Sequence, residues 1–266
     1  MASRSITSLG GTDLVAALGG TLNDGDNVFL NFGNDTITGS LNQAAKTFPR
    51  VALIGEFEGS LGDAGTYFEA QITLLDLMCA ARALYVKGGS GTGIVAKANL
   101  APTRTDCQIV FGTGTFTEVN LDGGNLVAND TADVNLLRQR GGSSTLRAGS
   151  ANTPTIEINA GTCRCERDFD SADVRGGLFS VIAVVGSTVP TPATISVAAG
   201  AVLDYRGGDI ATSLTVYGGG TADLTKLTTP RTIALVNNYP GAVLKAGPGM
   251  VTVTSYAYAN GPRFPL

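Results

Sequence analysis

The 266-residue chain contains no histidine and no tryptophan. Histidine is the commonest general base and metal ligand at neutral pH, so its absence rules out a Ser-His-Asp arrangement. Aromatic residues make up only 6% of the chain, which weakens the case for an extended platform on which sugar rings stack. These absences argue against a hydrolytic enzyme.

Charged residues are also scarce, at 15% of the chain compared with about 25% in typical globular domains. The formal net charge is −4, and the 18 basic residues are spread along the chain without a run of Lys or Arg. A nucleic-acid partner requires a basic stripe that neutralises phosphates. The composition therefore predicts a protein that does not bind nucleic acid.

Long apolar runs are missing as well. The N-terminal segment lacks the apolar core of about 7–15 residues that defines a signal peptide. No segment reaches the roughly 18 apolar residues of a membrane-spanning helix. We therefore expect a chain that is made in a cytoplasm, is not exported by the common route and does not enter a membrane.

Glycine is abundant, with 36 residues or about twice the average usage. Pairs such as Gly123-Gly124 and Gly176-Gly177 separate short runs rich in β-branched residues, which predicts an all-β fold. The segment 72–84 fits either a helix or two strands, and we favour strands. The other expected strands are Ala83–Lys87, Cys107–Phe111, Phe116–Leu121, Ile156–Ile158, Leu178–Val185, Val202–Tyr205, Leu214–Tyr217, Ile233–Val236 and Val243–Leu244.

An internal repeat defines the architecture. A Thr-Pro pair followed by a strand recurs from Thr153, Thr191 and Thr229, and it places Ile156, Ile195 and Ile233 at nearly equal spacings. The period lies in the range of solenoids, propellers and arrays. A unit of this length without a helix cannot bury its own apolar face, but stacked copies can. The repeat predicts a right-handed parallel β-helix, and it leaves open whether one repeat makes one wide coil or two tight ones.

The two ends of a solenoid need caps because each exposes unpaired strand edges. We expect residues 1–50 to form an N-terminal cap and docking region, residues 51–250 the β-helix, and residues 251–266 an extended tail. A short helix is expected at 12–18, with Thr12 as its N-cap and Gly19-Gly20 at its end. Aromatic side chains in the two end regions are the candidate partner-binding residues: Phe29, Phe32, Tyr256, Tyr258 and Phe264.

One acidic segment could carry chemistry. Glu166, Asp168, Asp170 and Asp173 lie close together, and paired carboxylates are what glycoside hydrolysis requires. Arg164, Arg167 and Arg175 alternate with them, so surface ion pairs explain the same cluster. We favour the second interpretation.

Metal binding is not expected. Cys163 and Cys165 form a single C-x-C, and Cys79 and Cys107 stand alone, so the spacing does not match that of a four-cysteine zinc site. The segments 25–28 and 33–37 resemble worn nonapeptides of calcium-binding repeats, but such sites need consecutive copies. We predict buried thiols, no metal and no cofactor.

The residues from Thr153 to Gly247, with their T-P-x-T-I and A-G-A-V-L or P-G-A-V-L segments, resemble the β-solenoid proteins on tailed-bacteriophage particles. That group includes tailspikes and trimeric head-decoration proteins. The resemblance implies a non-enzymatic homotrimer on the virion surface that binds the major capsid protein and stabilises the assembled head. The alternatives are a tail- or fibre-associated structural β-helix, or a polysaccharide-cleaving enzyme that uses Asp168, Asp170 and Asp173.

Overall fold

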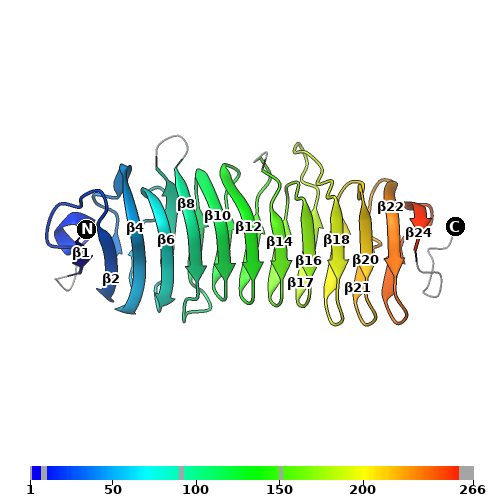
Figure 1. Ribbon diagram of the computed structural model, residues 1–266, viewed down its shortest axis with the longest axis horizontal. Helices are drawn as coiled ribbons and strands as arrows, with labels where there is room; N and C mark the ends of the chain where they lie inside the picture. Colours follow the sequence, from blue (N-terminus) through cyan, green and yellow to red (C-terminus); the bar gives the residue numbers. More distant parts are fainter. Residues whose placement is uncertain (1, 7–10, 90–92, 150–151, 258–266) are drawn as a thin grey trace. The chain divides into compact units, whose positions relative to one another are not determined.

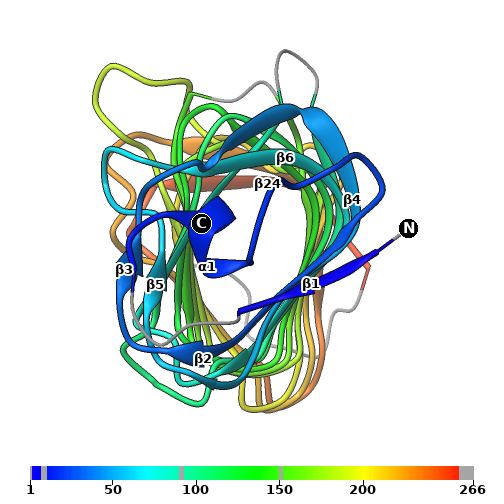
Figure 2. The same cartoon turned by 90° about the vertical axis from the view of Figure 1, so that its left-hand side faces the viewer.

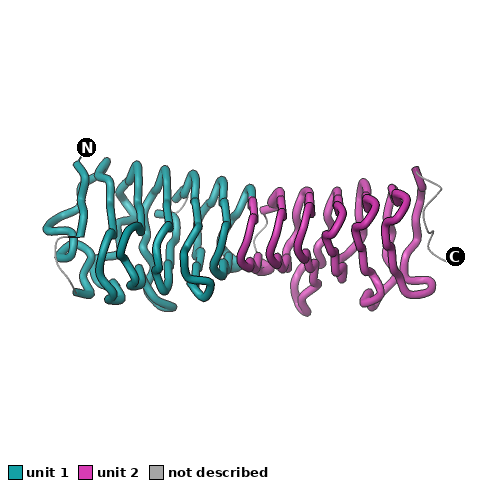
Figure 3. The backbone as a smooth tube through the Cα atoms, turned by 90° about the horizontal axis from the view of Figure 1, so that it is seen from below, with its two compact units in different colours: residues 1–136 teal, residues 137–266 magenta. Residues whose placement is uncertain are grey.

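The computed structural model describes residues 2–6, 11–89, 93–149 and 152–257. These residues form a parallel β-solenoid of about 12 coils with almost no helix, which confirms the all-β parallel architecture (Figure 1). The chain divides into two compact units, residues 1–136 and residues 137–266 (Figure 3). Each unit is described by itself below.

The strands of the first unit differ widely in length. They are β1 (Ser3–Ser5), β2 (Asn27–Gly33), β3 (Thr36–Ile37), β4 (Asn42–Phe57), β5 (Ser60–Leu61), β6 (Phe68–Cys79), β7 (Ala83–Gly88), β8 (Ile94–Leu100), β9 (Gln108–Phe111), β10 (Gly114–Leu121) and β11 (Asn125–Ala128). Strand β12 (Ala132–Gln139) includes the boundary between the units. The segment 72–84 is strand at both ends, as favoured above.

A column of leucines forms the core of the first unit. Strands β2, β4, β6, β8 and β10 pair in parallel, and one inward position on each strand is in register with the next. All five side chains at this position are fully buried, and they recur once per coil: Leu30, Leu53, Leu77, Leu100 and Leu121. Because neighbouring strands lie about 4.8 Å apart, each leucine packs directly on the next.

The coils begin earlier than residue 51. Strand β1 already pairs in parallel with β2, and β2 pairs with β4, so the boundary expected at residue 50 lies inside β4. The expected helix is present as α1 (Leu14–Ala17), but its N-cap is Asp13 and not Thr12. The Asp13 carboxylate accepts from the Ala16 amide at 2.9 Å and from the Ser40 hydroxyl at 2.6 Å. These bonds, that of Ser40 foremost, hold the pKa of Asp13 below its usual value.

Helix α1 closes the N-terminal side of this core. Viewed from that side, α1 lies within the outline of strands β1–β5 (Figure 2). Leu14, Ala17 and Leu18 are buried. The space left between α1 and the strands is about 10 Å³, no more than one water molecule occupies. The cap is therefore packed, and it leaves no ligand cavity in this place.

Asp26 ties the first strand to this end. It is 3% exposed, and its carboxylate accepts from the backbone amides of Asn23 and Ala2 at 3.0 and 3.2 Å and from Arg4 Nε at 3.4 Å. These donors, the Asn23 amide foremost, lower the pKa of Asp26. A carboxyl group with a lowered pKa stabilises the folded state above its ordinary pKa, and this contribution is lost as the pH falls through the lowered value.

Asp26→Asn should therefore lower the free energy of unfolding at pH 7 by about 1–3 kcal/mol, because charged hydrogen bonds are replaced by neutral ones. The deficit should shrink as the pH falls below 3.8, the ordinary pKa of the carboxyl group. Urea denaturation of both proteins at pH 7 and at about pH 3 measures this difference. A deficit that stays equal at both pH values would contradict the assignment.

The strands of the second unit are mostly four or five residues long. They are β13 (Ser143–Leu146), β14 (Thr155–Ile158), β15 (Thr162–Cys165), β16 (Ser171–Val174), β17 (Leu178–Ile182), β18 (Thr194–Val197), β19 (Val202–Arg206), β20 (Ser213–Val216), β21 (Thr221–Leu224), β22 (Arg231–Asn238), β23 (Val243–Ala246) and β24 (Val251–Tyr256). All six strands expected in this region are present, with ends that differ by up to three residues.

The Thr-Pro repeat corresponds to two coils. Ile156 is in register with Ala172, and Ala172 is in register with Ile195. The two isoleucines of the repeat are therefore two coils apart. The third copy is shifted relative to the sequence repeat. Ile195 pairs with Leu214, and Leu214 pairs with Val236 rather than with Ile233.

The C-terminal segment is regular for longer than expected. Residues 251–256 form β24 and pair in parallel with β22, so this part is a strand of the solenoid and not an extended tail. Tyr258 and Phe264 lie outside the described residues.

Candidate functional site

The acidic segment lies between β15 and β16 and on β16 itself. Asp168 and Asp170 fall in the connecting loop, whereas Asp173 is on β16. Asp168 is half-buried and Asp170 is exposed, on either side of the buried Phe169. Glu166, Arg167 and Asp168 line an open pocket of about 510 Å³.

Most of these carboxylates already have donors. Glu166 forms an ion pair with Arg164 at 2.5 Å, and Asp173 forms one with Arg175 at 2.7 Å. Asp173 also accepts from the Ser196 hydroxyl at 2.6 Å. Two of the three interleaved arginines therefore pair with the acidic side chains.

Asp168 and Arg167 also have structural roles. Asp168 accepts from the Thr191 amide at 2.6 Å, which fastens the loop before β18. Arg167 is 2% exposed and donates to the Arg147 carbonyl oxygen at 2.7 Å. A carboxyl group that works as a general acid is usually set in an apolar pocket, and these side chains are in polar, partly open surroundings.

The four cysteines are buried free thiols. Cys163 and Cys165 both point into the core from β15, in register with Phe179 and Val181. Burial raises the pKa of Cys163 and of Cys107 to about 12, and it raises the pKa of Cys79 and Cys165 as well. A thiol with a raised pKa is a poor nucleophile and a poor metal ligand at neutral pH.

We expect none of the four thiols to react with Ellman's reagent in the folded protein at pH 8, and all four to react after unfolding in guanidinium chloride. The absorbance of the released thiolate gives the count directly. Reaction of any thiol within minutes in the native protein would contradict the burial described here.

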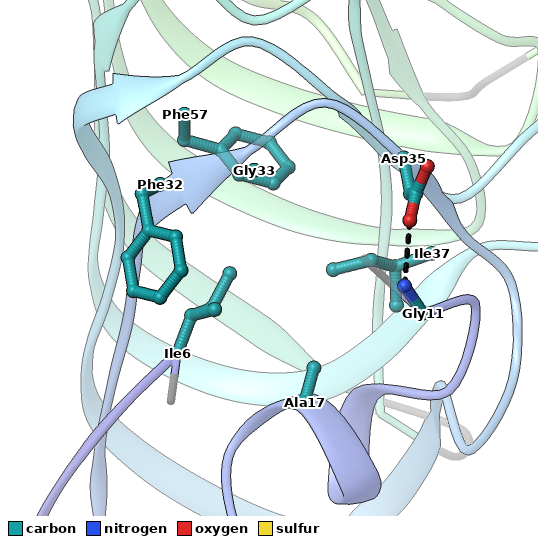
Figure 4. A pocket seen from close by; sticks show the side chains of 8 residues that line it. All are labelled: Ile6, Gly11, Ala17, Phe32, Gly33, Asp35, Ile37 and Phe57. Carbon is teal, nitrogen blue, oxygen red and sulfur yellow. Dashed lines mark hydrogen bonds between the residues drawn. The ribbon is translucent and has the colours of Figure 1, made fainter. Parts of the chain in front are cut away.

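Neither calcium-like segment is arranged as a metal site. Asp26 is taken up by the amides named above, and Asp35 accepts from the Gly11 amide at 2.6 Å (Figure 4). Among the described residues, no group of three or more acidic or cysteine side chains is close enough to hold a metal ion. The single described helix is too short to cross a bilayer.

The candidate partner-binding aromatics lie in different surroundings. Phe32 points into the N-terminal end of the core, together with Ile6 and Phe57 (Figure 4). Phe29 faces outward and is half-buried, with the Arg50 guanidinium 5.7 Å from its ring centre. Tyr256 is half-buried on β24, in register with Val236.

One exposed apolar surface was missed from the sequence. The turns after β18, β20 and β22 stack, with Gly200 donating to Gly219 at 3.0 Å and Gly219 to Gly241 at 2.9 Å. Apolar side chains project from these turns and from the strands that follow them. We call this surface the apolar corner, and its residues are Ala199, Val202, Tyr217, Tyr239, Pro240 and Val243.

Large apolar side chains of the apolar corner are exposed to solvent. Val202, Tyr217 and Val243 are 38%, 43% and 40% exposed. The rings of Tyr217 and Tyr239 stack at 4.9 Å between centroids. Val202 and Val243 occupy the same position on strands that flank β21. Thr221 occupies this position on β21, so the corner presents apolar side chains on consecutive coils with a threonine between the two valines.

Comparisons with protein-family models, with curated proteins and with solved structures gave no match.

Proposed function

We propose that this chain is a structural protein of a virus particle, a homotrimer that binds the major capsid protein and stabilises the assembled bacteriophage head from its outer surface. The apolar corner is the observation that supports this proposal most. Protein–protein contact is one of the roles that exposed apolar side chains gathered on one surface serve.

A second copy of the chain is the occupant that we propose for this surface. Tyr217 and Tyr239 stack on neighbouring coils, and Val202 and Val243 lie two coils apart with Thr221 between them. A second copy carries the same side chains at the same coil spacing, so the two surfaces can meet coil against coil. Three copies around an axis that runs along the stack of coils would bring three such corners together, coil against coil, in a closed cyclic assembly. Binding of the trimer to assembled heads would then stabilise them, because only the assembled state receives the binding energy.

The polar surfaces also favour a structural role over an enzymatic one. Asp168 and Asp173 accept hydrogen bonds from Thr191 and Ser196 on the next coil, and Glu166 forms an ion pair with Arg164 on its own coil. The open pocket beside Glu166 and Asp168 is the observation that favours the alternative, a polysaccharide-cleaving enzyme. Under the structural proposal, Asp168→Asn with Asp170→Asn leaves particle binding unchanged.

Co-sedimentation tests the proposal. The purified full chain is mixed with heads of the encoding virus assembled without it, and separately with tails. Saturable binding to heads, together with a higher temperature of head disruption, is the expected result. Binding to tails alone would replace the head assignment by a tail- or fibre-associated one, and binding to neither would refute a virion role.

A further inference from the structure

A polar pocket opens on the first unit, and it shares no residue with the apolar corner or the acidic segment. It has a volume of about 390 Å³ and lies between the loop from β3 to β4 and the loop from β5 to β6. Its polar lining carries hydroxyl, amide, carboxylate, ammonium and phenol groups: Thr38, Asn42, Thr66, Tyr67, Glu69 and Lys87. The residues come from segments well separated in the sequence, so only the register of the coils brings them together.

Three of these side chains form a row across neighbouring strands. Asn42 is in register with Glu69, and Glu69 with Lys87. Lys87 Nζ lies 2.9 Å from Glu69 Oε2, and the two side chains are 35% and 18% exposed. The row therefore places an amide, a carboxylate and an ammonium group on adjacent strands, about one strand spacing apart. It offers both hydrogen-bond donors and acceptors, and it carries no net charge.

Tyr67 supplies a fixed aromatic ring beside this row. Its ring meets that of Tyr85 edge to face, at 5.7 Å and 84°, and its hydroxyl accepts from Asn129 Nδ2 at 3.2 Å. Gly112 leaves room for the ring, because a Cβ there would lie 3.1 Å from the Tyr67 ring and would require a small shift. The ring is thus held in place from the protein side by groups that do not line the pocket.

Polar contacts fix the backbone of the two loops that form the walls of the pocket, alongside the buried Leu41. Ser40, in the first loop, has φ of +56° and is the only described non-glycine residue with positive φ. Its hydroxyl donates to Asp13, and its carbonyl oxygen accepts from Gln43 Nε2 at 2.8 Å. In the second loop, Asp63 and Thr66 exchange two backbone hydrogen bonds. Strained backbone maintained by its surroundings is typical of binding sites.

We propose that this pocket binds a neutral saccharide, in the size range of a mono- or disaccharide. The volume lies within the range of small-molecule sites, of about 300–1,000 Å³. Tyr67 lines the pocket, and its ring is the group that would meet the C–H face of a pyranose. Adjacent acceptor, donor and amide groups match vicinal hydroxyls, each of which donates and accepts. The charges of Glu69 and Lys87 neutralise each other in an ion pair, which favours an uncharged ligand over an ion.

Saturation-transfer NMR on the full chain tests this proposal, with maltose, lactose, cellobiose and N,N′-diacetylchitobiose as probes. At least one probe should receive saturation, with a dissociation constant on the order of 1 mM, which is about 4 kcal/mol of binding. Tyr67→Ala and Lys87→Ala should each weaken that binding by about tenfold or more. Tyr67→Phe keeps the ring and should retain most of it.

Lys97→Ala is the matched control, because Lys97 forms a similar ion pair with Glu118 at 3.0 Å on the same unit but does not line the pocket. It should bind like the unmodified protein. Lys87 is partly exposed, so Lys87→Ala remains informative even if Tyr67→Ala fails to fold. The proposal is overturned if none of the four probes receives saturation, or if Lys87→Ala binds as tightly as Lys97→Ala.

Discussion

Leu77→Ala should lower the free energy of unfolding by about 3–5 kcal/mol, the cost of opening a cavity in a close-packed core. Leu77 is the middle member of the leucine column and is fully buried between Leu53 and Leu100. Both neighbours belong to coils that cannot move closer without breaking their own backbone pairing. The site therefore cannot collapse around the missing side chain, and the full cavity cost is expected.

Leu74→Ala is the control for this prediction. Leu74 lies on the same strand as Leu77, but on the outward face, where it is half-buried between Arg50 and Lys97. Leu74→Ala should lower the free energy of unfolding by about 1 kcal/mol or less, because it removes far less buried apolar surface than Leu77→Ala does. Guanidinium denaturation of the two variants gives both values. Equal losses for Leu77→Ala and Leu74→Ala would show that the register of β6 is wrong.

Tyr217→Asp combined with Val243→Asp should convert the proposed trimer into monomers. Both side chains belong to the apolar corner, and a carboxylate buried without a partner in an apolar interface costs several kcal/mol. Light scattering should then give 27.1 kDa, the mass of one chain. The circular dichroism spectrum should stay unchanged, because both side chains are at least 40% exposed in the single chain.

Met78→Asp is the matched control for the corner variants. Met78 is 48% exposed on β6 and does not belong to the apolar corner. This variant should keep the native mass of the unmodified protein. If Met78→Asp dissociates the assembly while the corner variants do not, the contact surface between copies lies on the first unit instead.

The sequence was sufficient for the architecture because strands and turns are local features. Gly pairs and β-branched runs mark the strands of the second unit, and the Thr-Pro repeat indicates stacking. The coil length was not readable from the same repeat, because loops of different length alternate. Ile156 and Ile195 are two coils apart, and the coil from Ala172 to Ile195 is longer than the coil from Ile156 to Ala172. The long loop before β18 accounts for this difference.

A clearer signal was present in the first unit. The buried leucines from Leu30 to Leu121 recur once per coil at nearly regular intervals in the sequence. The residues that follow these leucines differ from coil to coil, so a search for a repeated sequence motif does not find them. The spacing between single leucines would have given the coil length directly, whereas the spacing of a multi-residue motif did not.

The candidate sites were harder to predict than the fold. Thr12 and Asp13 are both good N-caps by residue type, and the structure uses Asp13, whose carboxylate also accepts from Ser40, 27 residues away. The apolar corner and the polar pocket are made by residues on different coils. Their proximity follows from register, and register depends on loop lengths that the sequence pattern does not determine.

The native mass of the purified full chain in solution tests the central proposal most directly. The proposed trimer predicts about 81 kDa by light scattering, three times the chain mass of 27.1 kDa, at micromolar concentration and without added particles. A mass of 27.1 kDa that does not rise with concentration would contradict the trimer and leave the apolar corner without its proposed occupant.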